Sequence, residues 1–368
     1  MKIVLTGAGG GHFYPLIAVA ESLRKEVFNQ KLVSPEIYFF SDAPYNEKSL
    51  FDLRIKFIQI PSGKFTVYPS IDNFFSIFKN IFGIFVSIFK LYNIYPDVVF
   101  AKGGYASFPV IIAAKLLAIP IVVHESDSVA GRTTIFAGKI AKRVAISYKE
   151  ASKYFNNKNI ALVGLPIMER KLPPVGYKRV WEKKDRYTIF ILGGSQGSQR
   201  INSEIIDLLP SLLDKYDIVH QVGQNNLEDM KVLSNSVIKT HPFKDRYYIQ
   251  GFLDVSIFYP KVDLMITRAG SSLFEIALWQ LPSIVIPIPE NISRDQKSNA
   301  YTYAREQAGA VLEEDNFTKE IFLKTLSDIL NNKENYEKMI TGCHYFDYTR
   351  DAGSVIAKEI IKIALTHY

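Results

Sequence analysis

The sequence has a single cysteine, Cys343, among its 368 residues. One cysteine excludes a disulfide framework and a cysteine-based zinc site, and it suits a reducing compartment. The six histidines are scattered without the HxxxH spacing of a metal site. A DxD motif, which could hold a divalent metal, is also missing from the sequence. We therefore expect no metal and no other cofactor.

The first residues, MKIVLTG, read directly as a β-strand and lack the basic and apolar regions of a signal peptide. The net charge of +7 is moderate, and its sign alone suits nucleic acid, an anionic membrane or an anionic substrate. With 48% hydrophobic and 22% charged residues the chain is globular, and its length predicts two domains.

The first half repeats the order of strand, glycine-rich loop and helix. Lys2–Thr6 is a predicted strand that ends in a glycine run closing with His12, and we expect a helix over about 14–25. The loop does not match GxGxxG, because His12 holds the sixth position, and an acidic residue about 20 positions further on is missing. This pattern argues against a nicotinamide or flavin enzyme.

A second strand, 97–101, leads into Gly103, Gly104 and Tyr105 before an apolar helix at 109–117. Beyond it, a strand at 120–123 is followed by His124-Glu125-Ser126-Asp127. Polar groups just past a parallel strand lie where open α/β sheets bind ligands, and the alternative is ordinary loop solvation. His12 is expected where a helix begins, and there the helix dipole would keep it neutral and able to act as a base. It could equally be a capping or packing residue.

Residues 71–95 carry phenylalanines at helical spacing with isoleucines between them. The uninterrupted apolar run from 81 to 89 is bounded by Lys79 and Lys90, too short to span a membrane. The segment is therefore either a buried core helix or an interfacial helix whose aromatic side chains enter lipid while its lysines meet anionic headgroups. The pattern alone favours the core, because aromatic stripes on helices usually pack inside.

After a proline-containing linker at 164–175, the order restarts with strand Tyr187–Leu192, a glycine-rich loop at 193–197 and a helix from about Arg200. Strands are expected at 218–222 and 248–250. The repeat predicts two Rossmann-like, doubly wound domains that face one another across a cleft. We place them at 1–163 and 164–351, with the amphipathic helix at 352–367 joining the first.

The stretch 263–299 is the main candidate for ligand binding. Strand Leu264–Thr267 leads into a turn, Gly270-Ser271-Ser272, and a helix carrying Glu275; a strand at 283–288 and a polar loop with Asp295, Gln296 and Asn299 follow. Backbone N–H groups at such a turn suit phosphate, and a carboxylate one turn later can accept two sugar hydroxyls. The stretch is either a nucleotide-sugar pocket or an ordinary βαβ unit with a glycine cap.

Seven motifs along the chain resemble the family of MurG-type glycosyltransferases, in the same order and spacing: GAGGGHFYP, AKGGYASFP, HESDSVAG, GGSQGSQRIN, GFLD, RAGSSLFEIA and SRDQKSNA. The resemblance covers essentially the whole chain. It implies the GT-B fold and transfer of N-acetylglucosamine from UDP-GlcNAc to an undecaprenyl-diphosphate-linked muramyl-pentapeptide, lipid I to lipid II. The first domain would bind lipid I and the membrane, and the second would bind UDP-GlcNAc.

The resemblance also implies residue roles. Glu275 would bind the ribose, Leu253 beside Phe252 would contact uracil through its backbone, and Gln296 and Asn299 would bind the sugar. The diphosphate would lie against Gly194, Ser195, Gly270, Ser271 and Ser272. Acceptor-binding residues would be Gly10, Gly11, His12, Gly103, Gly104, Tyr105, His124 and Asp127.

In the light of the resemblance, the phenylalanine helix becomes a membrane-docking patch of Phe74, Phe78, Phe82, Phe85, Lys79 and Lys90, with Lys64, Lys139, Lys142 and Arg143 as further basic residues. The protein would then be peripheral, on the cytoplasmic face of the cell membrane. Nucleic-acid binding is not indicated, because the basic residues fall beside an apolar stripe.

The chain departs from the family at three places. HESD stands where the family usually has HEQN, so that Asp127 replaces an amide. The linker has Met168 where an arginine is usual, and Arg170 is a candidate replacement. The segment from Arg268 to Glu275 is about one residue shorter.

We infer direct displacement with inversion at the anomeric carbon. His12 is the hypothesised base, with Glu125 and Asp127 as rivals, and backbone N–H groups supplemented by Arg268 would stabilise the departing UDP. Two alternatives remain: a UDP-GlcNAc epimerase or a transferase for another lipid acceptor, and an inactive nucleotide-sugar-binding partner of a membrane complex.

Overall fold

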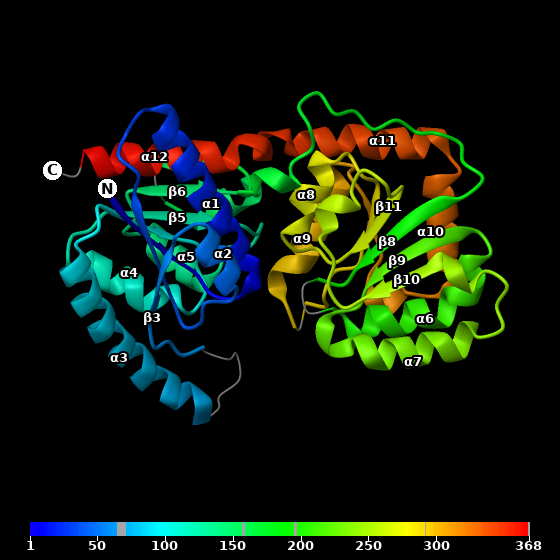
Figure 1. The fold of residues 1–368 in the computed structure, drawn as a ribbon, viewed down its shortest axis with the longest axis horizontal. Helices are drawn as coiled ribbons and strands as arrows, with labels where there is room; N and C mark the ends of the chain where they lie inside the picture. The colour runs from blue at the N-terminus through cyan, green and yellow to red at the C-terminus, as the bar shows by residue number, and fades with distance from the viewer. Residues whose placement is uncertain (65–70, 157–158, 195–196, 291, 367–368) are drawn as a thin grey trace. The chain divides into compact units, whose positions relative to one another are not determined.

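The computed structural model describes residues 1–64, 71–156, 159–194, 197–290 and 292–366 (Figure 1). Contacts between residues divide the chain into two compact units. The first comprises Met1–Glu169 together with Tyr348–Tyr368, and the second comprises Arg170–Asp347.

The described part of the first unit contains a parallel sheet of seven strands in the order β3-β2-β1-β4-β5-β6-β7. Its central strands are continuous apolar runs, as expected where helices cover both faces of a sheet. The strands are β1 (Lys2–Thr6), β2 (Glu36–Ser41), β3 (Lys56–Gln59), β4 (Val98–Ala101), β5 (Ile121–Glu125), β6 (Arg143–Ile146) and β7 (Ile160–Leu162).

Alternate residues of these strands point to two different helix layers. Ile3 and Leu5 share a core with α1 (Gly10–Asn29) and α12 (Ala352–Leu365). Val4 and Val99 share a second core with α4 (Ser107–Leu116), α5 (Arg132–Gly138) and the inner face of α3 (Ile71–Ile94). The last helix of the chain therefore completes the core of the first unit.

The second unit repeats the arrangement around a parallel sheet whose described strands number six, in the order β10-β9-β8-β11-β12-β13. The strands are β8 (Tyr187–Leu192), β9 (Tyr216–Gln221), β10 (Tyr247–Gln250), β11 (Leu264–Thr267), β12 (Ser283–Val285) and β13 (Ala310–Val311). The helices are α6 (Gln199–Leu213), α7 (Leu227–Ile238), α8 (Ser272–Leu278), α9 (Arg294–Arg305), α10 (Lys319–Leu330) and α11 (Lys333–Cys343). Two doubly wound α/β sheets, as predicted, are confirmed.

Several predicted boundaries were wrong, and each error has a local cause. Helix α1 begins at Gly10 because the N–H groups of His12 and Phe13 bond to the Gly9 carbonyl, which closes the first turn inside the glycine run. Strand β5 continues through His124 and Glu125, which pair with β6. These two side chains therefore belong to the strand and do not follow it.

The predicted polar loop at 295–299 is helical. Asp295, Gln296 and Asn299 all lie on α9. Ser293 precedes this helix and Asp295 is in its first turn, a combination that favours a helix start. The predicted strand at 283–288 is correspondingly shorter, since β12 ends at Val285.

Candidate functional site

The glycine loops of the first unit meet where the strand order of the sheet reverses. The chain runs from β1 outward to β2 and β3, and then crosses to β4 on the other side of β1. Open α/β sheets bind ligands at such a switch point, beyond the carboxyl ends of the strands. A Cβ atom on Gly104, whose φ is +78°, would lie 2.8 Å from the Cβ of Ala8. The structure thus brings the loop at Gly103-Gly104 against the loop that leads to His12.

The ring of His12 is held by the backbone of Lys102. Its Nδ1 lies 3.1 Å from the carbonyl oxygen of Lys102, so a neutral ring donates from Nδ1 and leaves the lone pair on Nε2. Burial among the surrounding atoms and the charge of Lys102 lower the pKa of His12 to about 4. The shift favours the neutral form, and its causes are burial and a neighbouring ammonium group.

Glu125 fixes the loop after β5 with both carboxylate oxygens. They accept from the N–H of Asp127 at 3.0 Å, from the N–H of Gly131 at 2.9 Å and from the Thr134 hydroxyl. His124 is fully buried and its Nε2 lies 2.8 Å from the carbonyl oxygen of Gly164. Asp127 is partly exposed, so it is the more accessible of the two rival carboxylates.

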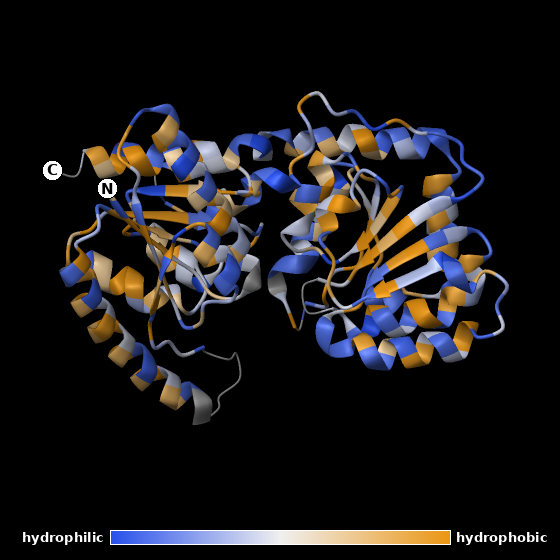
Figure 2. Cartoon of the chain, viewed as in Figure 1, coloured by the Kyte–Doolittle hydropathy of each residue, from blue (hydrophilic) through white to orange (hydrophobic). Residues whose placement is uncertain are grey.

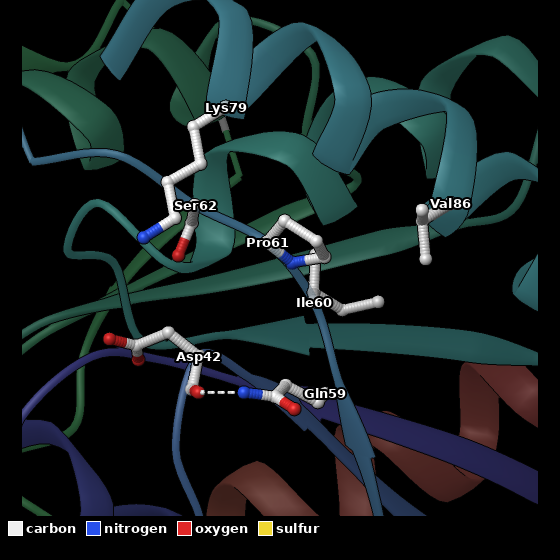
Figure 3. A pocket seen from close by; sticks show the side chains of 7 residues that line it. All are labelled: Asp42, Gln59, Ile60, Pro61, Ser62, Lys79 and Val86. Carbon is white, nitrogen blue, oxygen red and sulfur yellow. Dashed lines mark hydrogen bonds between the residues drawn. The ribbon is translucent and has the colours of Figure 1, made fainter. Parts of the chain in front are cut away.

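Tyr105 connects the loop at Gly103-Gly104 to a cavity beside α3. Its hydroxyl donates to Asp42, which also accepts from Tyr45 at 2.6 Å. Figure 3 shows Asp42 at one side of the cavity, with the side chain of Gln59 bonded to its backbone carbonyl at 3.1 Å. The cavity volume is about 360 Å³, and the lining residues are Asp42, Gln59, Ile60, Pro61, Ser62, Lys79 and Val86.

Helix α3 presents its aromatic stripe outward and its small and polar residues inward. The side chains of Phe74, Phe78, Phe82 and Phe85 are 56% to 66% exposed. Figure 2 shows hydrophobic residues recurring along the coloured part of the helix. The core position that the pattern alone favoured is therefore wrong for this stripe.

The inner face of α3 is built for close contact. Ser76, Asn80 and Ser87 are buried there, and Asn80 accepts from the N–H of Gly63 and donates to its carbonyl, at 3.0 and 3.1 Å. A Cβ atom on Gly83 would lie 1.9 Å from the carbonyl oxygen of Pro61. By length and composition, Asn73–Ile94 is a candidate membrane span. This differs from our prediction, which judged only the apolar run from 81 to 89 and found it too short. The bonded inner face ties the helix to the first unit instead.

In the second unit, Glu275 on α8 accepts three hydrogen bonds. Lys171 Nζ lies 2.8 and 3.0 Å from its two oxygens, and the Tyr259 hydroxyl lies 2.8 Å from Oε2. The Glu275 and Lys171 side chains are 13% and 16% exposed. The carboxylate predicted to bind ribose is thus paired with a lysine from the linker.

Other residues predicted to bind UDP-GlcNAc also form hydrogen bonds or ion pairs within the protein. Arg268 forms an ion pair with Glu314 at 2.5 Å and donates to the carbonyl of Ile286 at 3.1 Å. Asn299 donates to the Ala269 carbonyl at 3.1 Å, and Gln296 accepts from the N–H of Ile288 at 3.4 Å.

The remaining residues predicted to bind UDP-GlcNAc differ in their exposure and contacts. The N–H of Leu253 bonds to Gln221 Oε1 at 2.8 Å, while Phe252 is exposed. Gly194 has a φ of +94°, and an added Cβ on Gly194 or on Gly270 would find nothing within 4 Å. Ser271 precedes α8 and Ser272 is its first residue. Ser195 lies outside the described residues.

Sequence reasoning missed Lys102 and the partners of Glu275. Lys102 stands between a buried strand and a pair of glycines. A charged residue in this position could have been recognised as a candidate site residue from the sequence. Lys171 and Tyr259 lie far from Glu275 in sequence, so no spacing rule could have found them. At the departure in the linker, Met168 is buried in the core of the first unit, and Arg170, the candidate replacement, pairs with Asp254 at 3.1 Å. Within the described ranges, no cluster of three or more His, Cys, Asp or Glu side chains could hold a metal.

The chain matches known proteins along nearly its whole length. The model of the glycosyltransferase family 28 N-terminal domain matches residues 3–146, and that of the glycosyltransferase family 28 C-terminal domain matches residues 188–350. The UDP-N-acetylglucosamine--N-acetylmuramyl-(pentapeptide) pyrophosphoryl-undecaprenol N-acetylglucosamine transferase of Clostridium kluyveri is 32% identical over 367 residues, which cover 97% of this chain and 99% of that protein.

Two solved structures share the fold. The crystal structure of Acinetobacter baumannii MurG has a TM-score of 0.73 and 23% identity, covering 98% of this chain and 99% of that one. A putative UDP-N-acetylglucosamine 2-epimerase from Listeria monocytogenes has a TM-score of 0.70 and 13% identity, covering 99% and 96%. Fold alone therefore does not separate a transferase from an epimerase.

Proposed function

Because the chain belongs to glycosyltransferase family 28, we propose that it transfers N-acetylglucosamine from UDP-GlcNAc to undecaprenyl-diphosphate-linked muramoyl-pentapeptide, converting lipid I to lipid II in peptidoglycan synthesis. The observation that carries this function is the 32% identity over 97% of the chain to a transferase of that name. An epimerase shares the fold but is far more distant in sequence.

The second unit is the proposed donor-binding half. Glu275 accepts the ribose hydroxyls, Leu253 and Phe252 receive uracil, and Gln296 and Asn299 bind the sugar. The turns at Gly194–Ser195 and Gly270-Ser271-Ser272 offer backbone N–H groups to the diphosphate. The open space around Gly270 supports this placement, because a phosphate needs close access to the backbone.

In the proposed reaction, the acceptor hydroxyl attacks the anomeric carbon of UDP-GlcNAc. The new C–O bond forms as the bond to the UDP oxygen breaks, with inversion, and the hydroxyl proton passes to Nε2 of His12. The bond from Nδ1 to the Lys102 carbonyl supports this assignment, since it directs the lone pair to Nε2. Fixed backbone N–H groups meet the charge on UDP, so no metal is required.

The substrate assay is UDP release from UDP-GlcNAc, with and without a lipid I analogue and with and without EDTA. We expect release only with the acceptor and no effect of EDTA. Release without acceptor would favour a hydrolytic reaction, and conversion of UDP-GlcNAc without net UDP release would favour an epimerase. Loss of activity with EDTA would overturn the metal-free mechanism.

For the base, we expect His12→Ala to lower kcat about 100-fold or more, the lower range of general-base contributions. UDP binding should be unchanged. His344→Ala, at an exposed histidine, is the matched control. Near wild-type turnover of His12→Ala would remove His12 as the base and leave Asp127 as the better candidate.

The first unit is also the proposed membrane-binding half, which makes the protein peripheral at the cytoplasmic face of the membrane. The outward stripe of α3 and its exposed Lys79 and Lys90 support an interfacial position, with aromatic rings in lipid and ammonium groups at anionic headgroups. Lys64, Lys139 and Lys142 add positive charge to the same unit.

Vesicle sedimentation tests the membrane proposal. Phe78→Glu and Phe85→Glu should weaken binding to phosphatidylglycerol-containing vesicles by about tenfold or more and leave the circular dichroism spectrum unchanged. Phe28→Glu, at an exposed phenylalanine of α1, is the control. Equal binding by all variants would contradict the proposal, and loss of folding would show that α3 is needed for the core.

A further inference from the structure

Lys102 is a buried cation without a direct partner. Its side chain is 1% exposed, and no described residue offers a hydrogen-bond acceptor within reach of Nζ. Burial of an ammonium group without hydrogen bonds is costly, so such a group persists only where nearby charge compensates it. Its backbone carbonyl contacts His12 and its charge lowers the pKa of that histidine, but neither role explains why the ammonium group is buried without a partner.

The position of Lys102 is the switch point of the sheet. Ala101 pairs with Thr6 on β1 and with Val123 on β5, so Lys102 follows between Gly7 and His124. A Cβ atom on Gly7 would lie 3.3 Å from the Cβ atoms of both Lys102 and His12. The lysine therefore emerges at the edge where the acceptor loops meet.

The charged groups that act on this ammonium are Glu125 and Asp127, while His12 and His124 are neutral neighbours. Burial lowers the pKa of Lys102 to about 8 against the opposing effect of the two carboxylates, so the ammonium form prevails at neutral pH. Glu125 is already held by two backbone N–H groups and the Thr134 hydroxyl. Asp127 stands at the position where MurG-type glycosyltransferases usually have an amide side chain.

We propose that Lys102 is a positioning residue that balances the charge of Asp127, so that an acceptor carrying a diphosphate can approach the switch point. This inference rests on the proposed function, since it assumes an anionic acceptor. By formal charge, Lys102, Glu125 and Asp127 together carry one net negative charge. Without Lys102 the site would carry two net negative charges, and these would repel a phosphate even at an effective dielectric constant of about 20.

The test is a double-mutant cycle with acceptor KM, donor KM and kcat measured separately. Lys102→Met should raise acceptor KM about 30-fold, which is about 2 kcal/mol at 1.4 kcal/mol per factor of ten. Asp127→Asn should lower acceptor KM severalfold. The double variant has the same net charge as the wild type and should return to within about threefold of its acceptor KM. Donor KM should not move in any variant.

Lys115→Met, at an exposed lysine of α4, is the control and should match the wild type. Failure of Asp127→Asn to rescue Lys102→Met would assign Lys102 a packing role and overturn the proposal. A collapse of kcat in Asp127→Asn without a change in acceptor KM would also overturn it, by making Asp127 the base. If Lys102→Met does not fold, Asp127→Asn alone tests the proposal. A lower acceptor KM in Asp127→Asn supports charge balance, and a higher one contradicts it.

Wild-type turnover separates this inference from the proposed function. If the wild type does not use the lipid-linked diphosphate acceptor at all, the proposed function fails. If the wild type is active and the cycle shows no coupling, only the role of Lys102 fails.

Discussion

Replacing Glu275 with glutamine tests the proposed UDP-GlcNAc site at the residue whose contacts are best defined. The glutamine side chain keeps the shape and one hydrogen-bond acceptor but removes the charge that meets Lys171 and would meet the ribose hydroxyls. Hydrogen bonds to charged groups contribute about 1.5–3 kcal/mol, so donor KM should rise about 10- to 150-fold. The free protein should also lose about 1–2 kcal/mol of unfolding free energy, because the Lys171 ammonium is left poorly paired.

The assay combines UDP titration by calorimetry, steady-state kinetics with varied UDP-GlcNAc, and thermal unfolding. For a domain of this size, the loss of stability corresponds to a Tm lower by about 2–8 °C. Glu228→Gln, at a highly exposed carboxylate of α7, is the matched control and should change none of these quantities. A lower Tm with unchanged UDP affinity and donor KM would show that Glu275 serves only to hold Lys171, and the ribose assignment would be wrong.

Three further predictions concern the second unit. Lys171→Met should lower the Kd of UDP severalfold in calorimetry, because ribose then no longer competes with the ammonium for Glu275; an increased Kd would mean that Lys171 itself contacts the nucleotide. Burial lowers the pKa of His220 to about 3, so its contribution to stability is complete above pH 6.5 and is lost as the pH falls from 6.5 towards 3. Urea unfolding should show this loss at up to about 1.4 kcal/mol per pH unit, and His220→Gln should flatten it. Burial raises the pKa of Cys343 to about 12, so Ellman's reagent should label the native thiol only at the rate at which the unit opens; rapid labelling would contradict its burial.

The fold was predictable because strand and loop signals are local. Lys2–Thr6, Tyr187–Leu192 and Leu264–Thr267 are apolar runs that end in glycine or polar turns, and the structure has these strands at the predicted bounds. The helical segment around Gln296 was missed because its polar residues resemble a loop. The local signal for this helix, Ser293 followed by Asp295 in the first turn, was overlooked among the polar residues.

The site was only partly predictable, since its contacts join distant segments. The resemblance singled out Glu275 as a candidate, but its partner Lys171 is 104 residues away in sequence. Periodicity correctly made α3 a helix, yet it favoured the wrong face for burial. The decisive residues are Asn80 and Gly83, whose short or polar side chains allow the backbone contacts of the inner face.

The return of α12 to the first unit affects the order in which the protein can fold during synthesis. Gly353 packs so closely on α1 that an added Cβ would lie 2.4 Å from the Ser22 hydroxyl, and Ile356 and Ile360 fill the core beside Leu23. The ribosome makes the whole second unit before these residues emerge. The second unit can therefore complete its core first. Until α12 is made, the face of α1 that α12 covers stays exposed, and apolar surface exposed during synthesis is prone to aggregation and is bound by chaperones.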